Sequence, residues 1–206
     1  MDERTRVRRV VRDLIAIDRA VYVASAATPA PELDAALRRL SAAADHSKIS
    51  FAIAGILALR PGAPRRAALV GAAAIGAASA SANLLVKVLA RRPRPDRDAG
   101  QVPPARHVPM PASASFPSGH SASAFAFATA VSTELPWTAA PLDLLATAVA
   151  YSRVHTGVHY PADVVAGALL GMICASAVVG AQRVLHPQSY AAGMWCAPAC
   201  RTRSAG

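Results

Sequence analysis

The sequence contains few aromatic residues, few cysteines and few acidic residues. Aromatic residues make up 5% of the chain and do not alternate with the basic residues, as they do in proteins that stack nucleic-acid bases, so we expect no nucleic-acid partner. Three cysteines are too few for a disulfide framework. Two of them, Cys196 and Cys200, lie in a polar tail without the spaced ligands of a zinc site. We therefore expect no structural metal.

Charged side chains are also scarce, at 17% of the 206 residues, whereas 53% are hydrophobic. The hydrophobic residues are mostly alanine and valine, and such small residues allow helices to pack closely inside a membrane. We predict an all-α, membrane-embedded bundle of about five to six helices. The formal charge of +10 suits an anionic partner, either a membrane surface or a phosphorylated substrate.

The first 46 residues are predicted to form basic amphipathic helices that lie on the membrane surface. Apolar residues recur there at helical spacing, and five arginines precede Asp13. Asp13, Asp18 and Arg19 interrupt the apolar segment that a signal peptide would need. A charged helix packed on the domain is the alternative interpretation. His46, in the polar connector that follows, is expected to face solvent.

Residues 47–186 are predicted to form the membrane bundle, and residues 187–206 a polar tail. Two uncharged stretches can span a ~30 Å hydrocarbon core, and an uncharged run of eleven residues is short for a span. A helical hairpin and a long proline-rich loop separate the two spans. The expected segments are the short run Ile49–Leu59, the span Ala67–Val86, the loop Lys87–Pro117, the hairpin Gly119–Ser152 and the span Val164–Gln182.

This order of crossings brings three polar clusters to one membrane face. Lys87 and Arg94 follow the first span, and both cations can reach one anion there. Ser118 and Gly119 begin a helix whose N-terminal N–H groups favour an anion, with His120 beside it. Three further arginines of the loop are expected to meet lipid head groups or water. They are Arg91, Arg92 and Arg97.

The third cluster, within Tyr151–Val165, places an arginine, a histidine and an aspartate between two apolar runs. Asp163 falls in the first turn of a helix, so its carboxylate can reach one ring nitrogen of His159 and leave the other free to attack phosphorus. Arg153 adds a cation for the phosphoryl oxygens. Each residue alone has an ordinary structural explanation, but their combination with the other clusters is specific. His155 is interpreted as a supporting residue.

Together these three motifs resemble the three-part signature of the type 2 phosphatidic acid phosphatase superfamily, in its bacterial integral-membrane branch. The resemblance covers roughly Ala67 to Leu185 and matches all the defining positions. It implies a lipid phosphatase that needs no metal or other cofactor and works through a phosphohistidine. His159 would be the nucleophile, oriented by Asp163, and His120 the general acid and base. The phosphate would be held by Lys87, Arg94, Ser118, Gly119 and Arg153.

Two alternatives are weighed against this hypothesis. A soluble vanadium-dependent haloperoxidase shares the phosphate-binding signature, but the two uncharged spans argue against it. A non-catalytic lipid-binding membrane protein would not need both His120 and His159. The sequence leaves homo-oligomerisation open.

The substrate is expected to be a membrane lipid phosphate or a prenyl mono- or diphosphate, and the Ala- and Arg-rich composition slightly favours prenyl carriers. We place the protein in the cell membrane with several crossings. Four arginines near the predicted site against six on the opposite face favour a site on the outer face.

Overall fold

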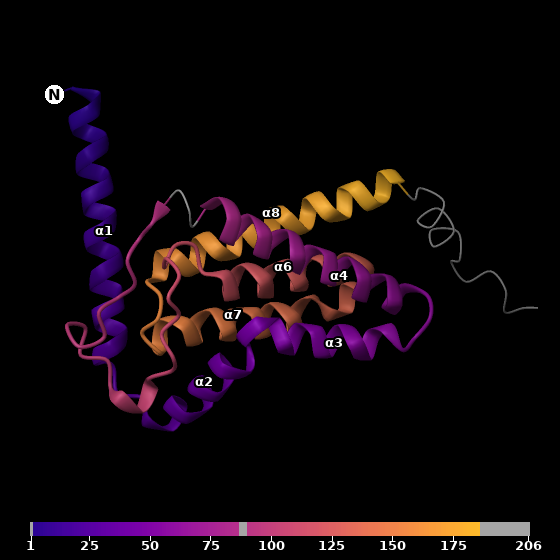
Figure 1. The fold of residues 1–206 in the computed structure, drawn as a ribbon, viewed down its shortest axis with the longest axis horizontal. Helices are drawn as coiled ribbons and strands as arrows, with labels where there is room; N and C mark the ends of the chain where they lie inside the picture. The colour runs from indigo at the N-terminus through magenta and orange to yellow at the C-terminus, as the bar shows by residue number, and fades with distance from the viewer. Residues whose placement is uncertain (1, 87–89, 186–206) are drawn as a thin grey trace, which may run out of the picture.

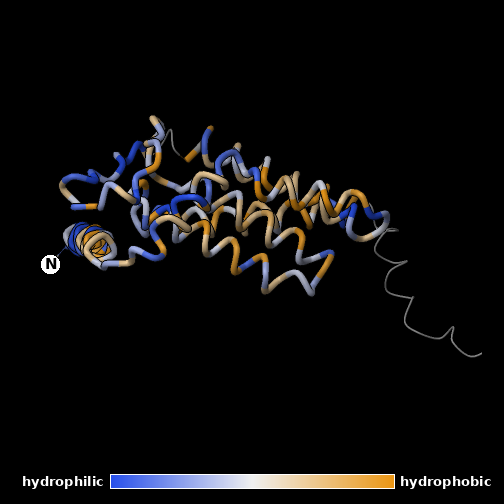
Figure 2. Tube along the Cα trace, turned by 90° about the horizontal axis from the view of Figure 1, so that it is seen from below, coloured by the Kyte–Doolittle hydropathy of each residue, from blue (hydrophilic) through white to orange (hydrophobic). Residues whose placement is uncertain are grey.

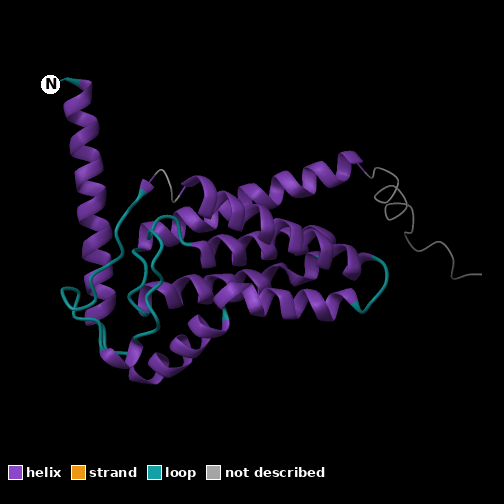
Figure 3. Cartoon of the chain, in the orientation of Figure 1, coloured by secondary structure: helices purple, strands orange, loops and turns teal. Residues whose placement is uncertain are grey.

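The computed structural model describes residues 2–86 and 90–185, and within these ranges it contains seven α-helices and no strand (Figures 1 and 3). The all-α prediction is therefore confirmed. Lys87 and the two cysteines of the tail lie outside the described residues. The helices are α1 (Glu3–Ala27), α2 (Pro31–Ala43), α3 (Lys48–Ala58), α4 (Ala63–Ala80), α6 (Gly119–Glu134), α7 (Ala139–His155) and α8 (Pro161–Leu185).

Helix α6 lies at the centre of a bundle and packs on α4, α7 and α8. The core between these helices is built largely from fully buried alanines. Gly167 and Gly171 of α8 lie directly against the α6 backbone, where a Cβ on either would collide with the carbonyl oxygen of Ser118 or Ala122. These two glycines therefore allow α6 and α8 to pack backbone to backbone.

Two described helical segments are long and apolar enough to cross a membrane. They are Ala63–Leu84, in which α4 continues into a π-helical turn, and Pro161–Leu185. Both overlap the predicted spans. Large apolar side chains such as Leu144, Leu169 and Ile173 are exposed on the outside of the bundle, where they suit a hydrocarbon environment.

The polar segments gather at one end of the bundle (Figure 2). The proline-rich loop and the α7–α8 connector meet there, as the order of crossings predicted, and the α2–α3 connector lies beside them (Figure 3). Helix α1 crosses this end nearly at right angles to the bundle (Figure 1). Its C-terminal half packs on the bundle through Asp18, Tyr22 and Ala26, whereas its N-terminal half is exposed.

Arg106 of the loop fixes the C-terminal end of α1. Its guanidinium is 1% exposed and donates to the carbonyl oxygens of Ser25, Ala26 and Thr28, while Nε donates to Asp34 Oδ1 at 2.8 Å. A cation at this position also complements the helix dipole of α1. Helices α1 and α2 are therefore tied to the same end of the bundle as the predicted site.

Candidate active site

An open cavity of about 260 Å³ lies at the polar end of the bundle. Four of the residues predicted for the site line it together, namely Arg94, Gly119, His120 and His159. Three others are buried and do not line it, namely Ser118, Arg153 and Asp163. The structure thus brings residues from the loop, from α6 and from the α7–α8 connector around one space.

His159 sits in the connector between α7 and α8, and its backbone N–H is held by the Arg153 carbonyl oxygen at 3.2 Å. Its Nε2 is 3.2 Å from Arg94 Nη1, on the cavity side. Its Nδ1 lies 3.4 Å from Ser115 Oγ and 3.6 Å from Asp163 Oδ2. Burial lowers the pKa of His159 to about 4, further lowered by Arg94 and partly opposed by Asp163. The imidazole is therefore neutral at pH 7, and its Nε2 lone pair accepts from Arg94 Nη1 in this structure.

Asp163, in the first turn of α8, is completely buried and accepts hydrogen bonds from three directions. Ser115 Oγ donates at 2.5 Å, the Tyr160 N–H at 2.9 Å and Arg92 Nη1 at 2.8 Å. Asp163 therefore contacts His159 at ion-pair distance, while its shorter bonds go to other groups. Ser115 was not predicted, and its position three residues before Ser118 is the only hint that the sequence offers.

The prediction that Arg92 faces lipid head groups or water is wrong. Its guanidinium bridges two buried carboxylates, with Nη1 on Asp163 and Nη2 on Asp18 at 2.5 Å. It also lies over the Tyr160 ring, 4.2 Å from the centroid. A planar fork with donors on both sides can join two acids in this way, whereas burying either acid alone would be costly.

Arg94 approaches the cavity from the loop and is fixed by backbone oxygens. Its Nε donates to the Ser113 carbonyl oxygen at 2.9 Å, and Nη1 donates to the Val158 carbonyl oxygen at 2.9 Å. Burial lowers the pKa of Arg94, since its guanidinium is partly removed from water. A cation held this way beside His159 can stabilise charge on a phosphoryl oxygen.

His120 is the second residue of α6, two residues after the N-cap Ser118, whose Oγ accepts from the Ser121 N–H at 3.4 Å. The His120 Nε2 atom lies 2.7 Å from Asp45 Oδ1 in the α2–α3 connector. Asp45 was not predicted for the site, although it is the only acidic residue in the connector that precedes α3. His120 and Asp45 form a second histidine–carboxylate pair.

Arg153 is 1% exposed and donates from Nη1 to Ser41 Oγ at 2.6 Å, with Asp45 Oδ1 at 3.9 Å. Its contact with a bound phosphate stays a prediction. His155, predicted as a supporting residue, lies 2.8 Å from Asp34 Oδ1 through Nε2, and His46 is exposed at the rim of the cavity. Within the described ranges, no group of three or more His, Cys, Asp or Glu side chains could hold a metal ion.

Comparison with known proteins places these features in a family. Residues 67–185 match the PAP2 superfamily. The decaprenylphosphoryl-5-phosphoribose phosphatase of Mycobacterium tuberculosis is 38% identical over 156 residues, which cover 73% of this chain and 81% of that protein. The protein of the same name from Mycolicibacterium smegmatis is 39% identical over 150 residues, covering 71% and 78%.

Two solved structures have the same fold. The transmembrane PAP2-type phosphatidylglycerolphosphate phosphatase of Bacillus subtilis superimposes with a TM-score of 0.67 at 22% identity, covering 84% of this chain and 88% of that one. LpxE of Aquifex aeolicus superimposes with a TM-score of 0.64 at 25% identity, covering 78% and 93%. The predicted bundle, membrane association and phosphatase class are therefore confirmed, and the chain belongs to the PAP2 superfamily of membrane lipid phosphate phosphatases.

Proposed function

We propose that this protein hydrolyses a prenyl-linked phosphate through a phosphohistidine on His159, without a metal. The observation that carries the proposal is the neutral His159 imidazole, with Nε2 at the cavity beside Arg94 and Nδ1 toward Ser115 and Asp163. Such an imidazole is a nucleophile that needs no further deprotonation at pH 7.

The proposed reaction has two displacements at phosphorus. In the first, His159 Nε2 forms a P–N bond as the bond to the lipid oxygen breaks, and His120 gives that oxygen a proton. In the second, His120 removes a proton from water, whose oxygen bonds to phosphorus as the P–N bond breaks. Inorganic phosphate leaves, and His120 is protonated again.

The phosphoryl oxygens would be held by cations and backbone N–H groups around the cavity. Arg94 and the Gly119 N–H at the start of α6 border the space directly. Ser118 would act through its cap on that helix start. Lys87 and Arg153 complete the proposed set on the strength of the motifs.

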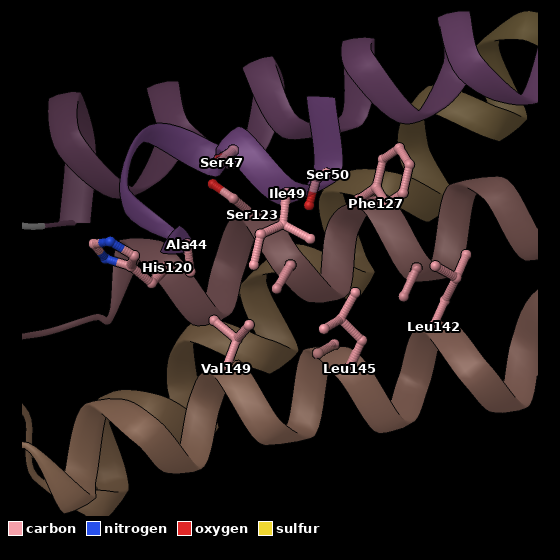
Figure 4. A pocket seen from close by; sticks show the side chains of 13 residues that line it. Ala44, Ser47, Ile49, Ser50, His120, Ser123, Phe127, Leu142, Leu145 and Val149 are labelled. Atoms are coloured by element: carbon pink, nitrogen blue, oxygen red, sulfur yellow. The ribbon is translucent and has the colours of Figure 1, made fainter. Parts of the chain in front are cut away.

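An apolar pocket beside the cavity supports a lipid chain on the substrate (Figure 4). The pocket lies between α3, α6 and α7 and is narrow in this structure, with a volume of about 20 Å³, and large apolar side chains line it, among them Ile49, Phe127 and Leu145. His120 and Ser123 border both this pocket and the polar cavity. A phosphate at His159 can therefore continue into a hydrocarbon chain, and the names of the mycobacterial relatives favour a prenyl chain.

The distribution of arginines between the two ends of the bundle bears on which membrane face carries the site. A count of only the loop arginines at the site favoured the outer face, but the structure places α1 at the same end of the bundle as the site (Figure 1). The six arginines of α1 and the two of α2, which lies at the same end, change the balance to twelve against six, so we propose that the site faces the cytoplasm. The exposed valines and leucine of α1 would then rest on the inner leaflet, as predicted for a surface helix.

The test is phosphate release from a panel of prenyl and glycerolipid phosphates in excess chelator, with wild type and His159→Ala. We expect activity that resists chelator, is highest on prenyl substrates and is abolished by the substitution. Full activity of the variant, or activity that returns only with a divalent metal, would contradict the mechanism.

The membrane face of the site is tested separately with Asp98→Cys in a cysteine-free background. An impermeant maleimide added to intact cells should not label this cysteine, and labelling would show that the site faces outward.

A further inference from the structure

A buried chain of polar contacts connects α1 with the carboxylate of the predicted nucleophile pair. Asp18 of α1 is 8% exposed and accepts from Arg92 Nη2, and Arg92 Nη1 donates to Asp163. Asp163 in turn faces His159 Nδ1 at 3.6 Å and accepts from Ser115 Oγ, which lies 3.4 Å from the same nitrogen. The loop thus contacts the Asp163 carboxylate directly, and α1 is linked to it through Arg92.

Asp18 holds the start of α8 in a second way. Its Oδ1 accepts from the Ala162 N–H at 2.7 Å, while Oδ2 accepts from Arg92. Ala162 and Asp163 are neighbours in the first turn of α8, where backbone N–H groups have no partner within the helix. A carboxylate at that point satisfies one of them and complements the helix dipole. Both oxygens of Asp18 therefore act on the turn that carries Asp163.

Aromatic packing fixes the position of α1 against this turn. The Tyr22 ring, one helical turn after Asp18, lies 5.3 Å from the Tyr160 ring, and Tyr160 also stacks under the Arg92 guanidinium. Arg92 has few alternative positions in this setting, because its two donor faces and its planar surface are all in contact. This is more than a surface ion pair, since both acids are removed from water.

We propose that Asp18 and Arg92 are positioning residues for the Asp163–His159 pair, so that α1 supplies part of the active site. The inference rests on the proposed function, in which His159 attacks phosphorus. Neither residue lines the cavity, so neither is assigned contact with substrate. Their effect is on the orientation of the Asp163 carboxylate, and hence on that of the imidazole that it faces.

The experiment compares three substitutions in the full-length protein, namely Asp18→Asn, Arg92→Lys and Arg92→Gln. Asn keeps the size of Asp18 but loses the charge, and Lys keeps the charge of Arg92 but cannot bridge two carboxylates at once. Misplacement of a reacting group by about 1 Å costs up to roughly a hundredfold in rate. We expect kcat to fall by that factor while KM changes less than about twofold, because no substrate contact is removed.

Asp13→Asn is the matched control. Asp13 lies on the same helix with its side chain 58% exposed and pairs only with the neighbouring Arg12 among the described ion pairs. We expect its kcat to equal that of wild type. In the double variant Asp18→Asn/Arg92→Gln, kcat should be no lower than in the less active single variant, because both substitutions break the same Asp18–Arg92–Asp163 bridge. The rate of phosphoenzyme formation in a single turnover should fall in parallel with kcat.

Each result decides the inference. Wild-type kcat in Asp18→Asn and Arg92→Lys would overturn it, as would a rise in KM with kcat unchanged or additive losses in the double variant. Thermal unfolding in detergent is measured for every variant, and unfolding of both conservative variants would show that the bridge holds the fold instead of aiming the pair. His159→Ala is run beside them. If it retains activity, the proposed function fails, whereas its inactivity with unaffected bridge variants refutes only the positioning role.

Discussion

Replacing Asp45 with asparagine should separate the two proposed roles of His120. Asp45 Oδ1 accepts from His120 Nε2 at 2.7 Å, which leaves Nδ1 as the nitrogen that can exchange a proton in the cavity. A carboxylate in this position fixes the tautomer of the ring and stabilises the imidazolium, which opposes the burial that lowers the pKa of His120 to about 4. Asparagine keeps the shape of the side chain but removes the negative charge.

The size of the effect follows from the exposure of the pair. A hydrogen bond to a charged group contributes about 1.5–3 kcal/mol, and the Asp45 side chain is 41% exposed, so the lower value applies. Because each 1.36 kcal/mol corresponds to a factor of ten, kcat on a lipid phosphate should fall by about tenfold in Asp45→Asn. His120→Ala removes the acid itself and should cost roughly 10²–10⁴-fold.

The assay compares a lipid phosphate with p-nitrophenyl phosphate, whose leaving group departs without a proton. In rapid mixing, the burst of p-nitrophenolate should keep its wild-type rate in Asp45→Asn, while steady-state turnover slows because His120 must still activate water. Asp143→Asn, on an exposed carboxylate near the other end of α7, should behave as wild type in both measurements. An equal loss of burst rate with both substrates would refute the general-acid assignment of His120.

Four further predictions concern His159, the α6–α8 contact and the apolar pocket. Because the pKa of His159 is lowered to about 4, the rate of single-turnover phosphoenzyme formation should fall only when the pH drops to about 4 to 5. A fall near the ordinary pKa of histidine would contradict the burial of His159. The lowered pKa also makes the free energy of unfolding depend on pH. The contribution of His159 is complete above the pKa that it has in the unfolded chain and is lost as the pH falls toward 4, which unfolding in detergent at several pH values can measure. Gly171→Ala should destabilise the bundle by roughly 1–3 kcal/mol, because its Cβ meets the α6 backbone, whereas Gly180→Ala, with open space around it, should not lower the unfolding temperature. Leu145→Trp should fill the apolar pocket and raise KM for a long-chain prenyl phosphate by roughly tenfold without affecting a water-soluble phosphate ester; equal effects on both would argue against a chain site.

The helices could be predicted because they depend on local sequence. The meeting of the three motifs could be predicted from the number of helices that cross between them. Uncharged stretches of sufficient length define the spans, Ser118 is an ordinary N-cap residue, and Pro161 is an ordinary first residue of a helix. Once the crossings are counted, His120 and His159 must lie at the same end. Helix α3 was expected from its apolar run, although its eleven residues are short for a span.

The choice of partners could not be predicted, because the sequence gives several candidates for each acid. Arg91, Arg92, Arg94 and Arg97 lie within seven residues, and only the path of the loop decides that Arg92 reaches Asp163 while Arg94 reaches the cavity. Asp18 and Arg92 are 74 residues apart, and neither has a periodic neighbour that points to the other. Contacts of this kind depend on side-chain geometry in the folded state.

The carboxylates of the N-terminal helices explain how a basic site can exist before substrate arrives. A phosphate site needs cations, and buried cations without counter-charges are costly. Arg92 is balanced by Asp18, Arg106 by Asp34, and His120 is joined to Asp45, so each partner comes from the first 46 residues. Removal of residues 1–46, which the sequence suggested as a separate unit, should therefore leave Arg92 and Arg106 without these partners. We expect the truncated protein to unfold at a lower temperature in detergent and to be inactive, and full activity after truncation would show that the bundle balances its own charges.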